Sequence, residues 1–447
     1  MMQAQTVAPL KVQRTSVKQK IARGMILAGI GSIILVKIYL VVFVIDLITG
    51  IYGLITTSLV FVAFLFAFLK YQDPSFTGKF PPPEKPHFVS VIIPAKNDPV
   101  IIRKSVAAIL NSTYPHTEII FVNDGSTDDT GAVMDELHKE NPEKVKVIHM
   151  VQNVGKRRAI REALLQGSPK GEIILLIDSD SVVKDDAIEK IVRVFDDPDV
   201  GAATGSAKVI NVDQNILTKI QDTWYDGQFF VIKGMESCFN SVTCCSGSLS
   251  AYRKEAILPC LDAWCNDKFL GIEFRPGDDR HLTSYVLGGN KHYIDRKNKS
   301  WKVVYCAGAL VYTEAPSTLK KFVNQQIRWK KSWVRVFLFN APFFFKNRHV
   351  VSVLYYYTQM TLSLLAPIIA YRALVYLPLN GRVYDAMFYL FGLLFLGLMF
   401  GITYRLRNPD TGDRWLYRIL MTPLSVFFSS LMYYSIFTVK NKSWLTR

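Results

Sequence analysis

Residues 172–181 read EIILLIDSDS, a short apolar run that ends in two acidic residues, Asp178 and Asp180. A continuous run of isoleucine and leucine of this length is typical of a strand that is buried on both faces. Three other runs have the same character: VSVIIPA at 89–95, EIIFVND at 118–124 and KVKVIHM at 144–150. We therefore expect four buried strands in this part of the chain.

Segments with helical periodicity separate these strands, at 99–112, 127–140 and 156–168. Alternating strands and helices predict an α/β domain with a mostly parallel, Rossmann-like sheet that is covered by helices. Ligands of such sheets bind beyond the carboxyl ends of the strands. Two acidic motifs, Asn123-Asp124-Gly125-Ser126 and Asp178-Ser179-Asp180, lie at those ends, where we expect a nucleotide to bind.

The chain before this domain is basic and then strongly apolar. Residues 1–24 are polar and carry five Lys and Arg, and two apolar runs follow at 25–47 and 51–69. Each run is long enough to cross a bilayer, so residues 25–70 are expected to form two transmembrane helices. The basic tail indicates a cytoplasmic start. The domain that follows, at 71–316, is then cytosolic and begins with a stiff, proline-rich linker.

The chain becomes apolar again after the soluble domain. Residues 317–348 predict interface helices, and 349–405 predict two further transmembrane helices. A third apolar run, at 417–439, is interrupted by Pro423 and precedes a basic C-terminus. We interpret 406–447 as an interfacial or re-entrant helix with a C-terminal segment, which keeps both ends of the chain in the cytoplasm.

The composition narrows the class of protein. Half of the 447 residues are apolar, which excludes a disordered chain and disfavours a purely soluble one. The net charge of +16 comes from residues that flank apolar runs, so it indicates membrane orientation and not nucleic-acid binding. All six cysteines fall in the soluble part, and reduced thiols fit that compartment. A zinc site is the alternative for four of them, Cys244, Cys245, Cys260 and Cys265, although their spacing is irregular.

Asp178 and Asp180 form the first candidate site. Carboxylates at a strand end can hold Mg²⁺ or Mn²⁺ together with substrate phosphates. Alone the pair is weak evidence, because about three acid-x-acid pairs are expected by chance in a chain of this composition. A solvated surface pair is the alternative.

Gly277-Asp278-Asp279-Arg280 is the second candidate site. Adjacent carboxylates raise each other's proton affinity, which suits one of them to accept a proton near neutral pH. The structural alternative is a helix start with an aspartate as N-cap. The two interpretations are compatible, since a base at a helix start is held firmly.

Two further motifs combine cations with neighbouring binding groups. A helix through 325–329, QQIRW, would place Gln325, Arg328 and Trp329 on one face, where they offer an amide, a cation for diphosphate and an aromatic plate for a sugar ring. An interfacial anchor helix is its alternative. The segment 153–158, NVGKRR, places glycine and cations at a helix start and suits phosphate, with a solvated helix start as the alternative.

In this order, VNDGS, DSD, GDDR and QQIRW resemble the motifs of the processive family 2 glycosyltransferases, which include the hyaluronan, chitin and cellulose synthases. The resemblance extends from about Phe88 to the end of the chain. It is greatest to the hyaluronan synthases of the class I type, which have counterparts of NVGKRRA, CSGSLSAYR, FLG before GDDRHLT, QQIRWKKSW and the terminal SWLTR.

This resemblance implies a GT-A nucleotide-sugar domain and specific roles for the motif residues. Asp124 would bind uridine, Asp178 and Asp180 would hold the metal and diphosphate, and Lys156 would face the donor. Asp279 would be the general base. The remaining roles fall into three groups: Gln325, Arg328 and Trp329 on the acceptor and diphosphate side; Cys245, Ser246, Gly247, Asp278 and Trp329 at the acceptor; and Trp444, Thr446 and Arg447 in a gating loop over the nucleotide.

The chain departs from the family pattern at three places. Ser248 stands where proline is common, Leu445 where glycine is common, and Val231-Ile232-Lys233 replaces the usual Val-Glu-Arg. The first departure touches the acceptor pocket and the second touches the gate. The acceptor pocket and the gate govern the identity of the sugars and the processivity.

The implied function is a multi-pass plasma-membrane enzyme, monomeric or homodimeric, with its catalytic domain in the cytoplasm. It would polymerise sugars from UDP-N-acetylglucosamine and UDP-glucuronate and move the polysaccharide across the lipid bilayer. Synthesis of a chitin-like, cellulose-like or other polymer is one alternative, and single transfer to a lipid phosphate is another. A membrane anchor or transporter that only binds nucleotides is disfavoured, because such a protein has no need of a base at Asp279.

Overall fold

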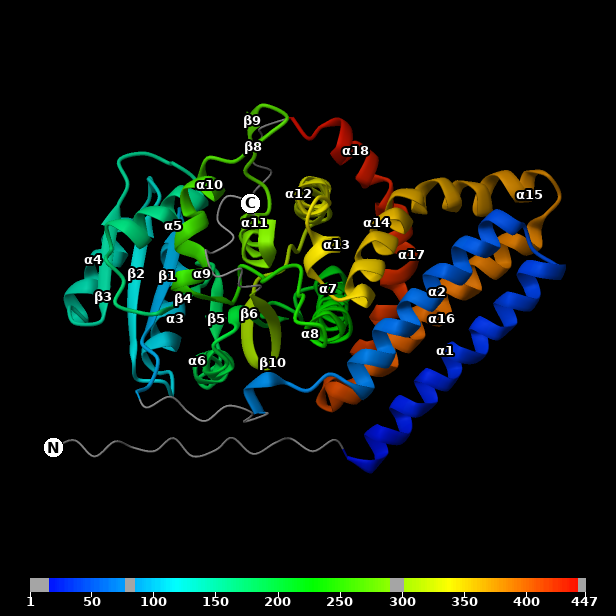
Figure 1. Cartoon of the computed structure of the whole chain (residues 1–447), viewed down its shortest axis with the longest axis horizontal. Coiled ribbons are helices and arrows are strands. Elements are labelled where there is room, and N and C mark those ends of the chain that lie inside the picture. Colours follow the sequence, from blue (N-terminus) through cyan, green and yellow to red (C-terminus); the bar gives the residue numbers. More distant parts are fainter. Residues whose placement is uncertain (1–15, 77–84, 290–300, 441–447) are drawn as a thin grey trace.

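The computed structural model describes residues 16–76, 85–289 and 301–440. An eight-stranded sheet with helices on both faces lies on one side of the molecule, and long apolar helices lie on the other (Figure 1). The strands follow the order β3-β2-β1-β4-β7-β6-β10-β5. Their bounds are β1 (Val89–Ala95), β2 (Thr117–Asn123), β3 (Val145–His149), β4 (Ile173–Leu176), β5 (Ser181–Val183), β6 (Val200–Val209), β7 (Ser250–Arg253) and β10 (Lys302–Thr313), with β8 (Lys268–Phe269) and β9 (Ile272–Glu273) as a separate hairpin.

The four predicted strands are confirmed as β1 to β4, and they pair in parallel. Every residue of β1, β2 and β4 is buried, as their continuous apolar sequences predict. The other half of the sheet is mixed, because β7 runs antiparallel to both β4 and β6. Strand β1 lies between β2 and β4, so the residues that follow β2 and β4 meet at one edge of the sheet.

Helices cover the sheet and lead from it to the apolar helices. The three predicted helices are confirmed as α3 (Pro99–Leu110), α4 (Thr130–Glu140) and α5 (Lys156–Leu165). The other helices of this part are α6 (Ala187–Val192), α7 (Ile216–Gly227), α8 (Gly234–Ser237), α9 (Lys254–Ile257), α10 (Leu261–Cys265), α11 (Asp278–Ser284), α12 (Leu319–Asn340) and α13 (Phe344–Asn347). Three short 3₁₀ helices, η1 (Pro74–Phe76), η2 (Arg193–Asp196) and η4 (Leu258–Cys260), and two π-helical segments, η3 (Gln228–Lys233) and η5 (Tyr285–Gly289), complete it.

Five helical segments of the described residues are long and apolar enough to cross a membrane: Val17–Phe43, Leu47–Phe76, Val350–Leu379, Val383–Arg407 and Pro409–Phe437. They contain α1 (Val17–Phe43), α2 (Leu47–Leu69), α14 (Val350–Tyr371), η6 (Arg372–Tyr376), α15 (Leu377–Leu379), α16 (Val383–Arg407), η7 (Pro409–Leu416), α17 (Tyr417–Ser429) and α18 (Leu431–Phe437). Helices α1, α2 and α16 pack side by side (Figure 1). The first four segments overlap the apolar runs from which four spans are expected, and the number of helices that cross the membrane remains a prediction.

The fifth apolar segment is divided. Helices α17 and α18 meet at Ser430, and α18 packs along α12, the helix that carries the QQIRW motif. The length and hydropathy of Pro409–Phe437 suit a helix that crosses the membrane. Its division into two helices suits a segment that stays near the membrane interface. The boundaries expected from the sequence for this region remain a prediction.

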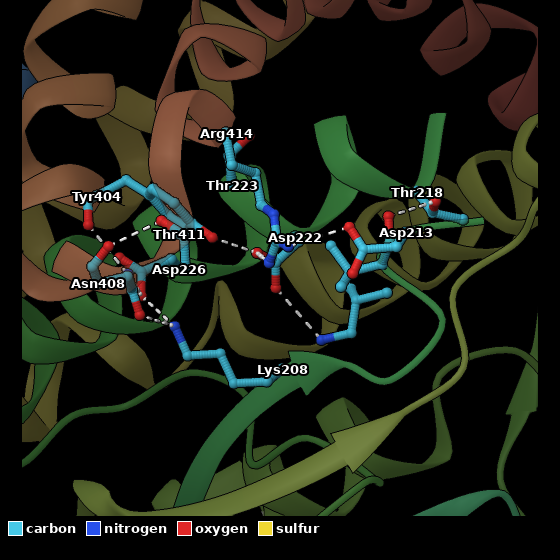
Figure 2. A network of polar contacts seen from close by, with 12 residues as sticks. Lys208, Asp213, Thr218, Asp222, Thr223, Asp226, Tyr404, Asn408, Thr411 and Arg414 are labelled. Atoms are coloured by element: carbon cyan, nitrogen blue, oxygen red, sulfur yellow. Dashed lines mark hydrogen bonds and ion pairs between the residues drawn. The ribbon is translucent and has the colours of Figure 1, made fainter. Parts of the chain in front are cut away.

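A buried polar network joins the sheet domain to the apolar helices (Figure 2). Asp226 of α7 is 3 % exposed and accepts hydrogen bonds from Lys208 Nζ at 2.6 Å, Arg407 Nε at 3.3 Å and Asn408 Nδ2 at 3.3 Å. One turn earlier, Asp222 accepts a hydrogen bond from the hydroxyl of Tyr404 at 2.6 Å. These contacts fix α7 against the end of α16.

Candidate active site

A cavity of about 1090 Å³ lies between the sheet domain and the apolar helices, and we name it the central cavity. Its walls in the sheet domain include the predicted motif residues Lys156, Asp178, Asp180, Asp278, Asp279, Gln325, Arg328 and Trp329. Its other walls are side chains of α1, α2, α14, α16 and α17. The structure therefore brings together motifs that are up to 173 residues apart in sequence and connects them to the membrane helices.

Lys156 and Asp178 form an ion pair at the start of α5 and the end of β4. Burial lowers the pKa of Lys156, but Asp178, and then Asp279 and Asp278, raise it further than burial lowers it, so the net pKa is above the usual value. Lys156 is thus a permanent cation on the cavity wall. A β-carbon at Gly247 would lie 2.9 Å from Asp178 Oδ2 and 3.1 Å from Lys156 Nζ, so glycine leaves the space that this pair needs.

The two carboxylates of the Asp178-Ser179-Asp180 motif fit a hard divalent cation. Both carboxylates line the central cavity beside Lys156, and oxygen ligands are those that Mg²⁺ and Mn²⁺ prefer. Within residues 16–76, 85–289 and 301–440 no cluster of three or more acidic, histidine or cysteine side chains is arranged to hold a metal by itself. The remaining ligands would be phosphate oxygens and water, which is the usual arrangement for magnesium in nucleotide sites.

Asp279 lies in the first turn of α11 and faces the central cavity. Its Oδ2 accepts hydrogen bonds from the backbone N–H of Gly247 at 3.2 Å and from Cys244 Sγ at 3.7 Å. Its Oδ1 accepts one from the backbone N–H of Arg280 at 2.7 Å. These donors fix the carboxylate without placing a cation directly on it. An oriented carboxylate on a cavity wall can accept a proton from a hydroxyl group.

Asp278 has a different environment from Asp279. It is buried and forms an ion pair with Arg157. Burial raises the pKa of Asp278, and Arg157 and Lys156 oppose that increase. The main partner of Asp278 is therefore inside the protein, and its role is to hold the start of α11 against α5.

The expected N-cap was wrong by one residue. Gly277, and not an aspartate, is the N-cap of α11, with a left-handed φ of 73°. A β-carbon at Gly277 would lie 1.7 Å from Ser332 Oγ of α12. The close approach of the two helices and the positive φ both require glycine here, so the two aspartates move into the first turn, where the helix dipole favours acidic residues.

Helix α12 presents Gln325, Arg328 and Trp329 to the cavity, as the helical spacing predicts. The Trp329 ring lies 5.8 Å from that of Trp224 and 6.2 Å from that of Tyr225, measured between ring centroids. Burial raises the pKa of Tyr225 to about 12, so its hydroxyl stays protonated and can donate. The three rings form an aromatic wall of the kind that binds sugar rings.

Sequence reasoning missed Trp224 and Tyr225. The signal was present as the aromatic cluster DTWYDGQFF at 222–230, but an isolated aromatic cluster is typical of a helix core as well as of a site. Only the packing of α7 beside α12 assigns these rings to the cavity.

Asp124 lies outside the cavity lining. Its two carboxylate oxygens accept hydrogen bonds from the backbone of Val154 at 2.7 Å and Gly155 at 3.0 Å. This holds the turn that precedes Lys156, and a β-carbon at Gly125 would lie 2.6 Å from the Asn153 nitrogen of the same turn. The expected contact with uridine remains a prediction.

The residues expected around the acceptor are only partly on the cavity wall. Ser246, Gly247 and Asp278 line it, but Cys245 is fully buried and Cys244 lines the cavity instead. Lys233 also lines it and donates a hydrogen bond to Ser246 Oγ at 2.9 Å. The three expected gating residues, Trp444, Thr446 and Arg447, lie outside the described residues.

Comparison with known proteins shows the family of the chain. The family model described as "Glycosyltransferase like family 2" matches residues 86–332. The chain is 30 % identical over 412 residues to the hyaluronan synthase of Streptococcus pyogenes, covering 89 % of this chain and 90 % of that protein. It is 32 % identical over 249 residues to an N-acetylglucosaminyltransferase of Rhizobium meliloti, covering 55 % of this chain and 56 % of that protein.

The fold also has a counterpart among solved structures. The mannosyltransferase PcManGT from Pyrobaculum calidifontis, in complex with GDP-Man and Mn²⁺, superposes with a TM-score of 0.58 at 18 % identity, covering 88 % of this chain and 99 % of that one. The sheet domain therefore has the GT-A fold. With a family model that covers more than half of the chain, and a hyaluronan synthase as a relative along nearly its whole length, the chain belongs to glycosyltransferase family 2 and is a membrane glycosyltransferase.

Proposed function

We propose that the chain is a hyaluronan synthase, which adds sugars alternately from UDP-N-acetylglucosamine and UDP-glucuronate and passes the polymer through its own membrane domain. The observation that carries this proposal is the central cavity, since the residues suited to transfer and the membrane helices line the same space. The hyaluronan synthases among its relatives support the choice of polymer.

In the proposed reaction the donor diphosphate lies beside Asp178, Asp180, Lys156 and Arg328. A divalent cation held by the two aspartates, Mg²⁺ or Mn²⁺, supplies charge stabilisation to the leaving diphosphate when bound. Lys156 and Arg328 add permanent positive charge at the same end of the site. Asp124 contributes by holding the turn that places Lys156.

Asp279 acts as the general base. It takes the proton from an acceptor hydroxyl as that oxygen forms a bond to the anomeric carbon, and the bond between that carbon and the diphosphate oxygen breaks. UDP leaves with the electron pair, and the configuration at the anomeric carbon inverts. The aromatic wall of Trp329, Trp224 and Tyr225 orients the acceptor sugar for this step.

The membrane side of the central cavity suits a polar chain. Helix α17 turns four polar residues toward it, at positions i, i+4, i+7 and i+11: Arg418, Thr422, Ser425 and Ser429. Hydroxyl and amide side chains of α2 and α14 also line the cavity, among them Thr56, Gln359 and Ser363. Polar residues on one stripe of an otherwise apolar helix mark a path for a polar substrate. We accordingly propose a plasma-membrane location with the catalytic domain in the cytoplasm.

A homopolymer synthase is the second candidate. It is favoured by the match to an N-acetylglucosaminyltransferase and by Ser248, which lines the cavity where proline is common in the family.

The test uses protein purified in lipid nanodiscs with Mn²⁺ and Mg²⁺, and measures UDP release with UDP-sugars added singly and in pairs. The proposal predicts hyaluronidase-sensitive polymer only when both donors are present, and none from Asp279→Asn. A polymer from one donor indicates the homopolymer synthase instead.

A further inference from the structure

We infer that the membrane part of the central cavity is a binding site for a sugar chain that carries carboxylates, and that Lys37 and Arg418 are the cations that bind it. The inference rests on the proposed function, because it assigns the chemical class of the chain that this function would move. The two cations would select an acidic sugar chain within the membrane, and this selection is separate from the choice of donor sugar at the transfer site.

Lys37 is a cation inside a membrane-spanning helix and lines the central cavity. Its Nζ donates hydrogen bonds across to α2, to Gly53 O at 3.1 Å and Thr57 Oγ1 at 2.5 Å. A β-carbon at Gly392 of α16 would lie 3.3 Å from the same nitrogen. Glycine in both neighbouring helices thus leaves room for an ammonium group at the meeting of α1, α2 and α16.

Arg418, near the start of α17, is the second cation that lines the central cavity. It is 6 % exposed, its guanidinium lies 4.5 Å above the Phe400 ring, and it donates a hydrogen bond to Thr422 Oγ1 at 3.2 Å. Its buried Nε has no hydrogen-bond partner within the part of the chain that the structure describes. That Nε faces Gly227 of α7, whose β-carbon position lies 3.7 Å away, so a ligand in the cavity would meet the other nitrogens of the guanidinium. A guanidinium without a protein anion is suited to bind a carboxylate.

The membrane helices do not supply counter-ions for these two groups. Neither Lys37 nor Arg418 forms an ion pair with any carboxylate in residues 16–76, 85–289 or 301–440. Asp385 of α16 lines the same cavity, but it accepts hydrogen bonds from Arg382 at 2.8 Å and from the Asp46 backbone at 2.5 Å. A buried cation without a protein anion is costly unless a ligand provides the negative charge.

A lysine near a helix end can also extend toward lipid headgroups. Lys37 lies six residues before Phe43, about 9 Å along the helix from its end. Its ammonium group points across to α2 and α16 instead, as its two hydrogen bonds and the nearby Gly392 indicate. Together with Arg418, this direction favours a ligand in the cavity over the membrane surface.

The test compares two labelled octasaccharides: hyaluronan, and hyaluronan whose carboxyl groups have been reduced to alcohols. Their dissociation constants are measured on the nanodisc protein, at low and high salt. We expect wild type to bind the acidic octasaccharide at least tenfold more tightly, and to lose that preference as salt rises. Lys37→Gln and Arg418→Gln should each lower the preference severalfold, and Lys37→Arg should retain it.

Lys20→Gln is the matched control, because Lys20 is an exposed cation of the same helix that does not line the cavity. It should bind both octasaccharides as wild type does. If a glutamine variant fails to fold, the wild-type preference and Lys37→Arg still decide the question.

UDP release from the same preparation separates the two proposals. If donors release UDP but wild type binds both octasaccharides equally, or neither, the charge selection is wrong and the proposed function stands. If no donor releases UDP, the proposed function fails and the inference fails with it.

Discussion

The backbone N–H of Gly247 donates a hydrogen bond to Oδ2 of Asp279 at 3.2 Å, and the carbonyl of Gly247 accepts one from the Asp178 N–H at 3.0 Å. One residue without a side chain therefore connects the proposed base to the proposed metal site. The β-carbon of any larger residue at position 247 would lie against Asp178 and Lys156. This arrangement sets the spacing between the donor side and the acceptor side of the cavity.

Gly247→Ala should impair donor binding and turnover. The added methyl group must displace either the Asp178 carboxylate or the Lys156 ammonium group, since contacts of 2.9 Å and 3.1 Å are too short. We expect UDP affinity to fall about tenfold, which corresponds to about 1.4 kcal/mol, as measured by calorimetry in nanodiscs. Gly24→Ala in α1, where nothing lies within 4 Å, is the control and should bind UDP normally. Unchanged UDP affinity in Gly247→Ala would argue against the assigned donor position.

Asp279→Asn and Asp278→Asn should fail in different ways. Asp279 faces the cavity, so its asparagine variant should fold normally and lose about 10²- to 10⁴-fold in turnover while still binding UDP. Asp278 is the buried partner of Arg157, so its asparagine variant should lower the melting temperature because the guanidinium loses its counter-ion. Differential scanning fluorimetry and UDP release on the same samples measure both effects. The assignment of the base is refuted if Asp279→Asn keeps its turnover.

The network between α7 and α16 should contribute strongly to stability. Asp226→Ala leaves Lys208 and Arg407 without their shared buried carboxylate, and we expect a loss of about 3–5 kcal/mol. Asp213→Ala removes the partner of Arg414 at a site where the aspartate is 75 % exposed, and should cost less than about 1 kcal/mol. Thermal or denaturant unfolding in the same detergent compares the two variants. If both variants lost the same free energy of unfolding, burial would not be what makes the ion pairs of Asp226 important.

The sheet domain should lose stability in mild acid through His281. Burial, and then Arg157 and Arg335, lower the pKa of His281 well below its usual value of 6.5. Asp267 lies 3.6 Å away but already pairs with Arg335, so it does not reverse this direction.

The unfolded chain therefore binds one more proton than the folded chain at pH values below 6.5, and stability falls there by up to about 1.4 kcal/mol per pH unit. His281→Gln should remove that part of the slope in melting experiments between pH 5 and pH 7. His116→Gln, at an exposed position, is the control variant.

The first half of the sheet was predictable because its strands are continuous apolar runs. The strands β6 and β7 are short of large apolar residues and contain alanine, serine, threonine and glycine, so their sequences alone do not distinguish them from loops. The grouping of Asp178, Asp279 and Trp329 followed from motif order, and the structure adds their connection through Gly247 and α12.

Long-range packing explains what the sequence did not predict. Gly277 replaces the expected N-cap because Ser332, 55 residues later, lies against it. Cys244, and not the expected Cys245, lines the cavity. Cys245 is buried, and its backbone N–H donates a hydrogen bond to Thr283 Oγ1 at 2.9 Å. Lys37 and Arg418 stood within apolar runs, and only the structure shows that both line the central cavity.

The most direct test of the central claim uses sealed proteoliposomes in which the catalytic domain faces outward. UDP-N-acetylglucosamine and UDP-glucuronate are added outside with Mn²⁺, and the labelled polymer is treated with hyaluronidase before and after detergent. The account predicts polymer that resists hyaluronidase until detergent opens the vesicles, and none with Asp279→Asn. Polymer that is digested without detergent would contradict passage through the membrane domain, and its absence with both donors would contradict the synthase itself.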